Sequence, residues 1–226
     1  MPGFRRKMSE PAHNELAAPP DSPEELGVDE ALALAIHVHR LGEYADAEKL
    51  YRRVLEASPD HADATHFLGV LAHHQGRSEE AVDIIRRSIA LGPGVADRYN
   101  NLGNVLVECG RAAEAAEAYR SVLALQPGHA DAWNNLGAAL RALGQFGESA
   151  DAYRKAIDLD PKHVDACNNM GNLLSARGQV KEAVAYYCMA ITLLPSHPEA
   201  RKMLGIAYYT LGRVDAAAEV FHAWLT

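Results

Sequence analysis

The sequence has little of what several common classes of protein depend on. Only three of its 226 residues are cysteine, and Cys109, Cys167 and Cys188 show no CxxC spacing. An odd and scattered set of cysteines is typical of a reducing compartment rather than of a disulfide framework, so we expect a cytoplasmic protein. No apolar run approaches the ~20 residues that cross a bilayer, and we therefore expect no membrane insertion.

Positive charge is scarce as well. The 22 Lys and Arg residues are outnumbered by 30 Asp and Glu residues, which gives a formal net charge of -8. A nucleic-acid partner requires a basic face to meet its phosphates, so this balance argues against one. The sequence also lacks the GxGxxG, P-loop and GxSxG motifs of common enzyme classes, and we expect neither catalysis nor a cofactor.

The histidines do not form a metal motif. His39 and His73 are 34 residues apart and could face each other across neighbouring structural units, but no HExxH or similar ligand spacing is present. We expect no metal site.

What the sequence does have is a strict internal period. Glycine and proline recur every 34 residues, at Pro59, Pro93, Pro127, Pro161 and Pro195, at Gly42, Gly76, Gly110, Gly144, Gly178 and Gly212, and at Gly69, Gly103, Gly137, Gly171 and Gly205. Apolar residues lie at helical spacing from Ala130 to Leu143 and again from Phe146 to Leu159, on either side of Gly144. Each unit therefore predicts an antiparallel pair of helices.

The residue types at fixed offsets within the unit resemble a known family. The tetratricopeptide repeat pattern of aromatic, Leu-Gly, large apolar, small, aromatic, small and proline is matched by Trp133, Leu136, Gly137, Leu140, Ser149, Tyr153, Ala156 and Pro161. This resemblance implies an all-α fold, a right-handed superhelical solenoid whose first helices line a concave face. The column of asparagines at Asn101, Asn135 and Asn169 resembles, in particular, the one along the repeats of O-linked N-acetylglucosamine transferases.

The period also suggests where the repeats begin and end. Six helix pairs fit, at residues 28–61, 62–95, 96–129, 130–163, 164–197 and 198–226, and the last is unfinished and lacks a capping helix. Its final helix carries an apolar stripe of Val220, Phe221, Trp224 and Leu225. Residues 1–27 contain five prolines and no period, so we expect a flexible N-terminal arm.

Asparagine gathers on the side of the first helices that is expected to face the groove. With Ala130 counted as position 1, positions 5, 6 and 9 of three consecutive units hold Asn100, Asn101, Asn104, Asn134, Asn135, Asn168, Asn169 and Asn172. Asparagine inside a helix costs roughly 0.6 kcal/mol relative to alanine. Two interpretations are open: these amides join neighbouring helices, or they bind the backbone of an extended peptide through paired donor and acceptor atoms.

An acidic column runs beside the asparagines. Position 2 is acidic in every unit, and in the asparagine-rich units it is Asp97, Asp131 and Asp165. The helix dipole alone favours an acid there by ~0.3–1 kcal/mol, although a basic peptide would also benefit from the negative charge. We include these three residues, and Arg141 at position 12, in the candidate peptide-binding surface.

Three functions remain open at this level. The first is a protein-interaction scaffold that binds an extended peptide along the groove, because stacked helix pairs provide a preformed surface. The second is the substrate-recognition part of a larger glycosyltransferase or methyltransferase that continues beyond residue 226. The third is a self-assembling scaffold in which the apolar C-terminal helix of one chain contacts the first repeat of the next.

Overall fold

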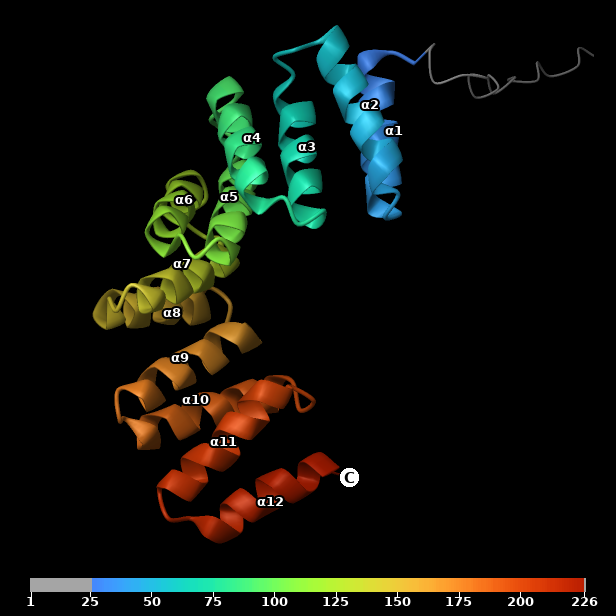
Figure 1. Cartoon of the computed structure of the whole chain (residues 1–226). Coiled ribbons are helices and arrows are strands. Elements are labelled where there is room, and N and C mark those ends of the chain that lie inside the picture. The colour runs from blue at the N-terminus through green and yellow to red at the C-terminus, as the bar shows by residue number, and fades with distance from the viewer. Residues whose placement is uncertain (1–25, 226) are drawn as a thin grey trace, which may run out of the picture.

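The computed structural model describes residues 26–225, with side chains as far as residue 222. This part of the chain contains only helices: α1 (Val28–Arg40), α2 (Tyr44–Ala57), α3 (Ala62–His74), α4 (Ser78–Leu91), α5 (Ala96–Glu108), α6 (Ala112–Leu125), α7 (Ala130–Ala142), α8 (Phe146–Leu159), α9 (Val164–Ala176), α10 (Val180–Leu193), α11 (Pro198–Thr210) and α12 (Val214–Leu225). They follow one another as antiparallel pairs (Figure 1). The prediction of an all-α solenoid of six helix pairs is confirmed.

A glycine in the left-handed conformation ends the first helix of each pair. Gly144, which follows α7, has a φ of 74°, and residues with a Cβ atom are strained there. Its amide donates to the carbonyl of Arg141, and the next amide, of Gln145, donates to that of Leu140. These bonds close the helix end, so the chain reverses within a few residues. The same conformation recurs at Gly42, Gly76, Gly110, Gly178 and Gly212.

The second glycine column lets the two helices of a pair approach closely. A Cβ atom added to Gly137 would lie 2.7 Å from the ring of Tyr153 on the partner helix. Tyr153 is fully buried, and the same relationship joins Gly103 to Tyr119 and Gly171 to Tyr187. Glycine thus provides the space that the aromatic ring fills, which explains why these two residue types recur together.

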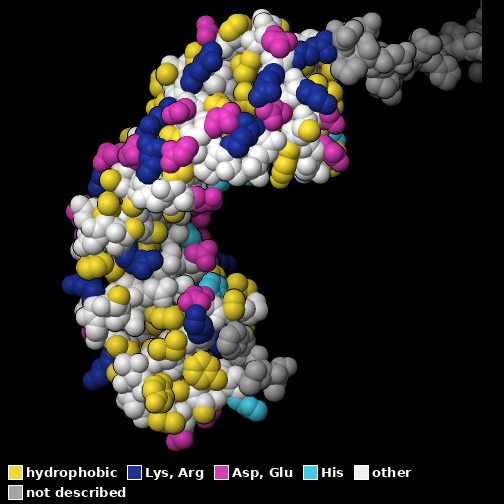
Figure 2. Space-filling view, in the orientation of Figure 1, with side chains coloured by type: hydrophobic (Ala, Val, Ile, Leu, Met, Phe, Trp, Pro, Cys, Tyr) yellow, Lys and Arg dark blue, Asp and Glu magenta, His cyan; other side chains and the backbone are white. Residues whose placement is uncertain are grey.

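The pairs stack into a curved array. Contacts join helices that are neighbours in the chain, and consecutive first helices such as α7 and α9 also touch. The array bends around one hollowed side, and acidic and histidine side chains lie along that hollow (Figure 2). No helix in the described part of the chain is both long and apolar enough to cross a membrane.

Two expectations concern residues that the structure does not describe. The predicted N-terminal arm falls almost entirely in residues 1–25, and the apolar stripe of α12 includes the side chains of Trp224 and Leu225. Residues 1–25 and the side chains of Trp224 and Leu225 lie outside the described part of the chain, whereas Phe221 of the stripe faces Gly205 on α11. On the neighbouring surface of the last two helix pairs, exposed apolar side chains are contributed by Leu194, Ile206, Tyr209 and Val214.

Candidate functional site: a concave asparagine pocket

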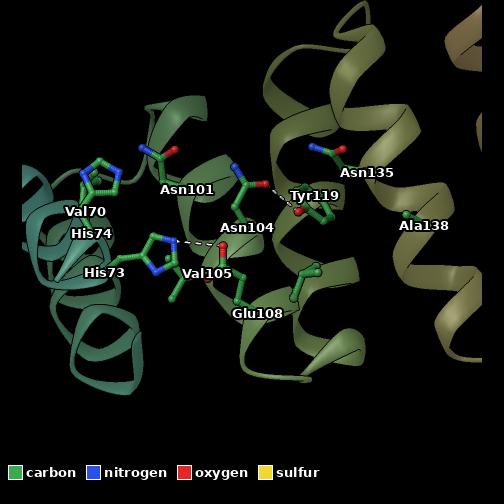
Figure 3. Close-up of a pocket in the computed structure, with 11 residues that line it drawn as sticks. Val70, His73, His74, Asn101, Asn104, Val105, Glu108, Tyr119, Asn135 and Ala138 are labelled. Carbon is green, nitrogen blue, oxygen red and sulfur yellow. Dashed lines mark hydrogen bonds and ion pairs between the residues drawn. The ribbon is translucent and has the colours of Figure 1, made fainter. Parts of the chain in front are cut away.

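A pocket of about 450 Å3 lies on the concave side of the array, between α3, α5 and α7. We call it the asparagine pocket because three of the predicted asparagines line it: Asn101, Asn104 and Asn135 (Figure 3). Its remaining wall is formed by Val70, His73, His74, Val105, Val107, Glu108, Tyr119 and Ala138. The pocket is therefore mixed in character, with amides along one part and aliphatic side chains, histidines and a carboxylate along the rest.

Each of the three amides makes one hydrogen bond within the protein, and its second polar atom, either Oδ1 or Nδ2, is open to the pocket. Asn104 accepts the hydroxyl hydrogen of Tyr119 at 2.8 Å, and Asn101 donates to Nε2 of His66 at 3.1 Å. Asn135 accepts from Nδ2 of Asn134 at 3.3 Å. Within residues 26–222, Oδ1 of Asn101 and the Nδ2 groups of Asn104 and Asn135 have no partner. They provide one acceptor and two donors at the pocket surface.

The asparagines at position 5 lie deeper than expected. Asn134 and Asn168 are only 8% and 6% exposed, because position 5 turns toward the next first helix rather than into the groove. Asn134 accepts from Nδ2 of Asn169, on α9, at 3.0 Å. The Oδ1 atoms of Asn100 and Asn168 are buried and have no hydrogen-bond partner among the described residues. Of the three amides at this position, only that of Asn134 bonds to a neighbouring first helix among the described residues.

Position 9 joins the two helices of a pair. Asn172 accepts from the hydroxyl of Tyr187 at 2.9 Å, just as Asn104 accepts from Tyr119. The pair between them in the chain has Ala138 at position 9, and the buried hydroxyl of Tyr153 has no hydrogen-bond partner in the described structure. Arg141 is exposed and lies close enough to lower the pKa of Tyr153, although burial raises that pKa more.

The acidic column takes part in contacts between consecutive first helices. His163, which caps the start of α9 by accepting from the amide of Ala166, places its Nε2 3.1 Å from Oδ1 of Asp131. His197 caps α11 in the same way and lies 3.5 Å from Oδ1 of Asp165. Asp131 and Asp165 remain largely exposed, so they are also accessible from solvent. Asp97 is exposed as well.

Between α3 and α5 the contact to the aspartate is made by Arg98 instead of a capping histidine. From α3 onward, Val95 stands where the other units have the capping histidine, and Arg98 stands where they have alanine. Its guanidinium is almost fully buried and donates to Oδ1 of Asp63 at 2.6 Å and to the carbonyl of Gly92 at 2.5 Å. A Cβ atom on Gly92 would lie 2.4 Å from Nη1 of Arg98, so only glycine leaves room for this arrangement.

His66 bonds to Asn101 and so helps to position one wall of the asparagine pocket. Burial lowers its pKa to about 4, and the nearby guanidinium of Arg98 adds to this effect. The imidazole is therefore neutral at pH 7, with Nε2 accepting from Asn101 and the hydrogen on Nδ1, which has no partner among the described residues. A neutral His66 fixes the direction in which the Asn101 amide points.

A second hollow, of about 420 Å3, adjoins the first at the N-terminal end of the array. We call it the aromatic pocket, because its floor contains Tyr44, Tyr51 and Phe67. His39 lies 3.2 Å from the hydroxyl of Tyr51 through Nδ1 and 2.9 Å from Nδ1 of His74 through Nε2. The expectation that His39 could face His73 is thus wrong by one residue, because His73 turns instead to Glu108, 3.4 Å away.

Several residues that shape the two pockets were not predicted from the sequence. The contacts His39–His74, Asp63–Arg98, His66–Asn101 and Asn134–Asn169 all join residues 35 apart. One period plus one residue is the offset at which consecutive first helices meet in this array. A search for polar pairs at that spacing would have found His66 and Arg98. In the described part of the chain, no group of three or more His, Cys, Asp or Glu side chains is placed to hold a metal ion.

Comparison with known proteins agrees with this architecture. The chain resembles several solved structures: MamA (23% identity, TM-score 0.68, covering 74% of this chain and 91% of that one), YrrB (22%, 0.68, 77% and 90%) and PilF of Pseudomonas aeruginosa (21%, 0.74, 85% and 88%). At these identities the likeness concerns the fold. No curated protein sequence matches the chain. The family model for the tetratricopeptide repeat matches residues 32–96, 100–164 and 168–226, and the chain therefore belongs to the tetratricopeptide repeat family.

Proposed function

We propose that this chain is an interaction scaffold that binds an extended peptide in the asparagine pocket. The observation that carries the proposal is the set of uncommitted amide groups on Asn101, Asn104 and Asn135. An acceptor and two donors on neighbouring helices match the N–H and C=O groups that an extended backbone presents. Each such hydrogen bond contributes about 0.5–1.5 kcal/mol, and the bound backbone need not have one particular sequence.

The amides of the asparagine pocket are held in place before a peptide binds. Tyr119, His66 and Asn134 each hold one of the three amides in place, so little side-chain freedom is lost when a peptide binds. The centre of the proposed site lies over α3, α5 and α7, nearer the N-terminus than Asn168, Asn169 and Asn172. The printed description of YrrB, one of the similar structures, is of a repeat protein with an unusual peptide-binding site, which supports the same class of ligand.

Two alternatives follow from other features. The likeness to the repeats of O-linked N-acetylglucosamine transferases favours a substrate-recognition role within a larger transferase, in which a catalytic domain follows residue 226. The exposed apolar side chains of Ile206, Tyr209 and Val214 favour self-association through the C-terminal helix pairs. We place the protein in the cytoplasm because its three cysteines are free.

A display selection tests the main proposal. Randomised peptides of about twelve residues, long enough to cross several helix pairs when extended, are selected against the full-length chain. We expect selected peptides to bind the double variant Asn101→Ala/Asn135→Ala about tenfold more weakly, because two hydrogen bonds are lost. Equal affinity for the parent and this variant would contradict a role for the amides.

Asn104 requires a control of its own because it also bonds to Tyr119. Asn104→Ala removes both the amide and that bond, whereas Tyr119→Phe removes the bond and leaves the amide. If the amide binds the peptide, only the first change weakens binding. Substitution of Gln145, an exposed amide outside the pocket, serves as a further control and should have no effect.

A further inference from the structure

The asparagine pocket and the aromatic pocket form one continuous surface. Val70 and His74, both on α3, line the two pockets at once. A peptide that lies across Asn135 and Asn101 and continues toward the N-terminal end of the array therefore passes directly over the aromatic pocket. The first helices carry a matching change of side chains at position 9, from Asn104 on α5 to Val70 on α3 and Ile36 on α1.

The aromatic pocket is a fixed cavity rather than a loose apolar patch. Tyr51 is fully buried, and its ring stacks on that of Phe67 at 6.3 Å between centroids and 12° between planes. Its hydroxyl meets Nδ1 of His39, whose other nitrogen meets His74. These contacts hold the rings in place from both sides. The volume of the hollow is at the small end of the range for ligand sites and suits one large side chain.

The mouth of the aromatic pocket carries an uncompensated positive charge. Arg40, the last residue of α1, lines the pocket and is exposed, and it forms no ion pair with any residue between 26 and 222. The chain as a whole is acidic, and the neighbouring pocket carries Glu108. A free arginine beside an apolar cavity is complementary to a ligand that presents a carboxylate next to an apolar side chain.

Resting on the function proposed above, we infer that the ligand is an extended peptide with a large apolar side chain and an adjacent carboxylate at one end. The apolar side chain fills the aromatic pocket and the carboxylate meets Arg40. Packed helices lie about 8–10 Å apart, so the path from α1 and α3 to α7 is about 20–25 Å. An extended chain covers that path in about six to eight residues, which sets the distance between the apolar residue and the backbone bound by Asn135.

The same randomised peptide selection provides the test. The inference requires that selected peptides share a Leu, Ile, Met, Phe, Tyr or Trp with an Asp or Glu within two residues of it. Ile36→Asp, which places a charge in the aromatic pocket at a residue that does not line the asparagine pocket, should weaken their binding about tenfold. A circular dichroism melt of the variant shows whether the helices remain intact.

Reversing the charge of Arg40 and removing the carboxylate of the peptide gives a second test, and the change in affinity it measures does not depend on packing. Arg40→Glu should weaken peptides that carry the carboxylate by about two- to fivefold, and should leave peptides with Asn or Gln in its place unchanged or slightly tighter. Arg154→Glu, at another exposed arginine on α8, is the matched control and should not discriminate between the two peptides.

The outcomes separate this inference from the proposed function. If the asparagine variants weaken binding but Ile36→Asp and Arg40→Glu do not, peptide binding stands and the aromatic pocket is not its anchor. If selected peptides lack an apolar and acidic pair, the inference is also overturned. If neither set of variants matters, both proposals fail.

Discussion

Arg98 on α5 and Asp63 on α3 form an ion pair in which one partner is buried and the other is exposed. The guanidinium is 5% exposed, the carboxylate is 57% exposed, and 2.6 Å separates Nη2 from Oδ1. The arginine also donates to the carbonyls of Ser88 and Gly92. It thus connects one helix pair to the next, in a unit that lacks the capping histidine.

This asymmetry predicts different costs for the two partners. Arg98→Met removes a donor from the carbonyls of Ser88 and Gly92, and we expect a loss of about 2–4 kcal/mol in unfolding free energy. Asp63→Asn keeps an acceptor beside the guanidinium and should cost about 1 kcal/mol. Urea titration followed by circular dichroism measures both. Equal losses would show that the ion pair, rather than the carbonyl contacts, determines the stability.

The tyrosines that face a glycine on the partner helix differ in their hydrogen bonds, and we expect their substitution by phenylalanine to have different effects on stability. Tyr119→Phe loses the hydrogen bond to Asn104 and should cost about 0.5–1.5 kcal/mol. Tyr153→Phe removes a buried hydroxyl that has no hydrogen-bond partner among the described residues, so it should be neutral or slightly stabilising. The difference between the two unfolding free energies checks the arrangement. A comparable loss at both positions would indicate that Tyr153 has a partner.

At two glycines of the same helix pair, we expect an added methyl group to have opposite effects on stability. Gly137→Ala brings a Cβ atom to 2.7 Å from the ring of Tyr153, and overpacking of this kind should destabilise the protein by about 1–3 kcal/mol. Gly147→Ala adds its methyl where nothing lies within 4 Å, in the first turn of α8. There alanine favours the helix, and we expect a gain of up to about 1 kcal/mol. Thermal unfolding of both variants provides the measurement.

His66 predicts how stability depends on pH. Its pKa is lowered from 6.5 to about 4, so between these values the unfolded chain binds a proton that the folded chain excludes. Stability therefore falls as the pH falls through this window, by at most about 1.4 kcal/mol for each pH unit. His66→Gln keeps an acceptor for Asn101 and removes the titration. The variant should lose less stability than the parent between pH 6.5 and pH 4, and identical pH profiles would contradict the prediction.

Most of the fold could be predicted from the sequence, because the glycines and prolines that end its helices act locally. Gly144 and Pro161 act on their own stretch of backbone, and their recurrence every 34 residues shows where helices end without any knowledge of packing. The residues between them identify the buried face through helical spacing. The pairing of Gly137 with Tyr153 is one step harder, since it requires knowing that both lie at the contact between the two helices.

The candidate site could be predicted only in part. Helical spacing placed positions 5, 6 and 9 on one side, but a single helix does not show how far the next one is rotated. That rotation buries Asn134 against α9 while leaving Asn135 at the pocket. The same cause explains why His66 was missed, since its role depends on Asn101 one period and one residue later. Such contacts depend on the superhelix, which the sequence of one unit does not contain.

The contact made by Arg98 means that the six helix pairs are not interchangeable parts. Gain or loss of a whole 34-residue block preserves the junctions where a histidine caps the next helix, because each block brings its own aspartate and histidine. The junction between α3 and α5 is different: Asp63 and Gly92 belong to one block and Arg98 to the next. Separation of these two blocks would leave a buried guanidinium without its acceptors, so an insertion or deletion at this boundary would destabilise the stack where one at the other junctions would not.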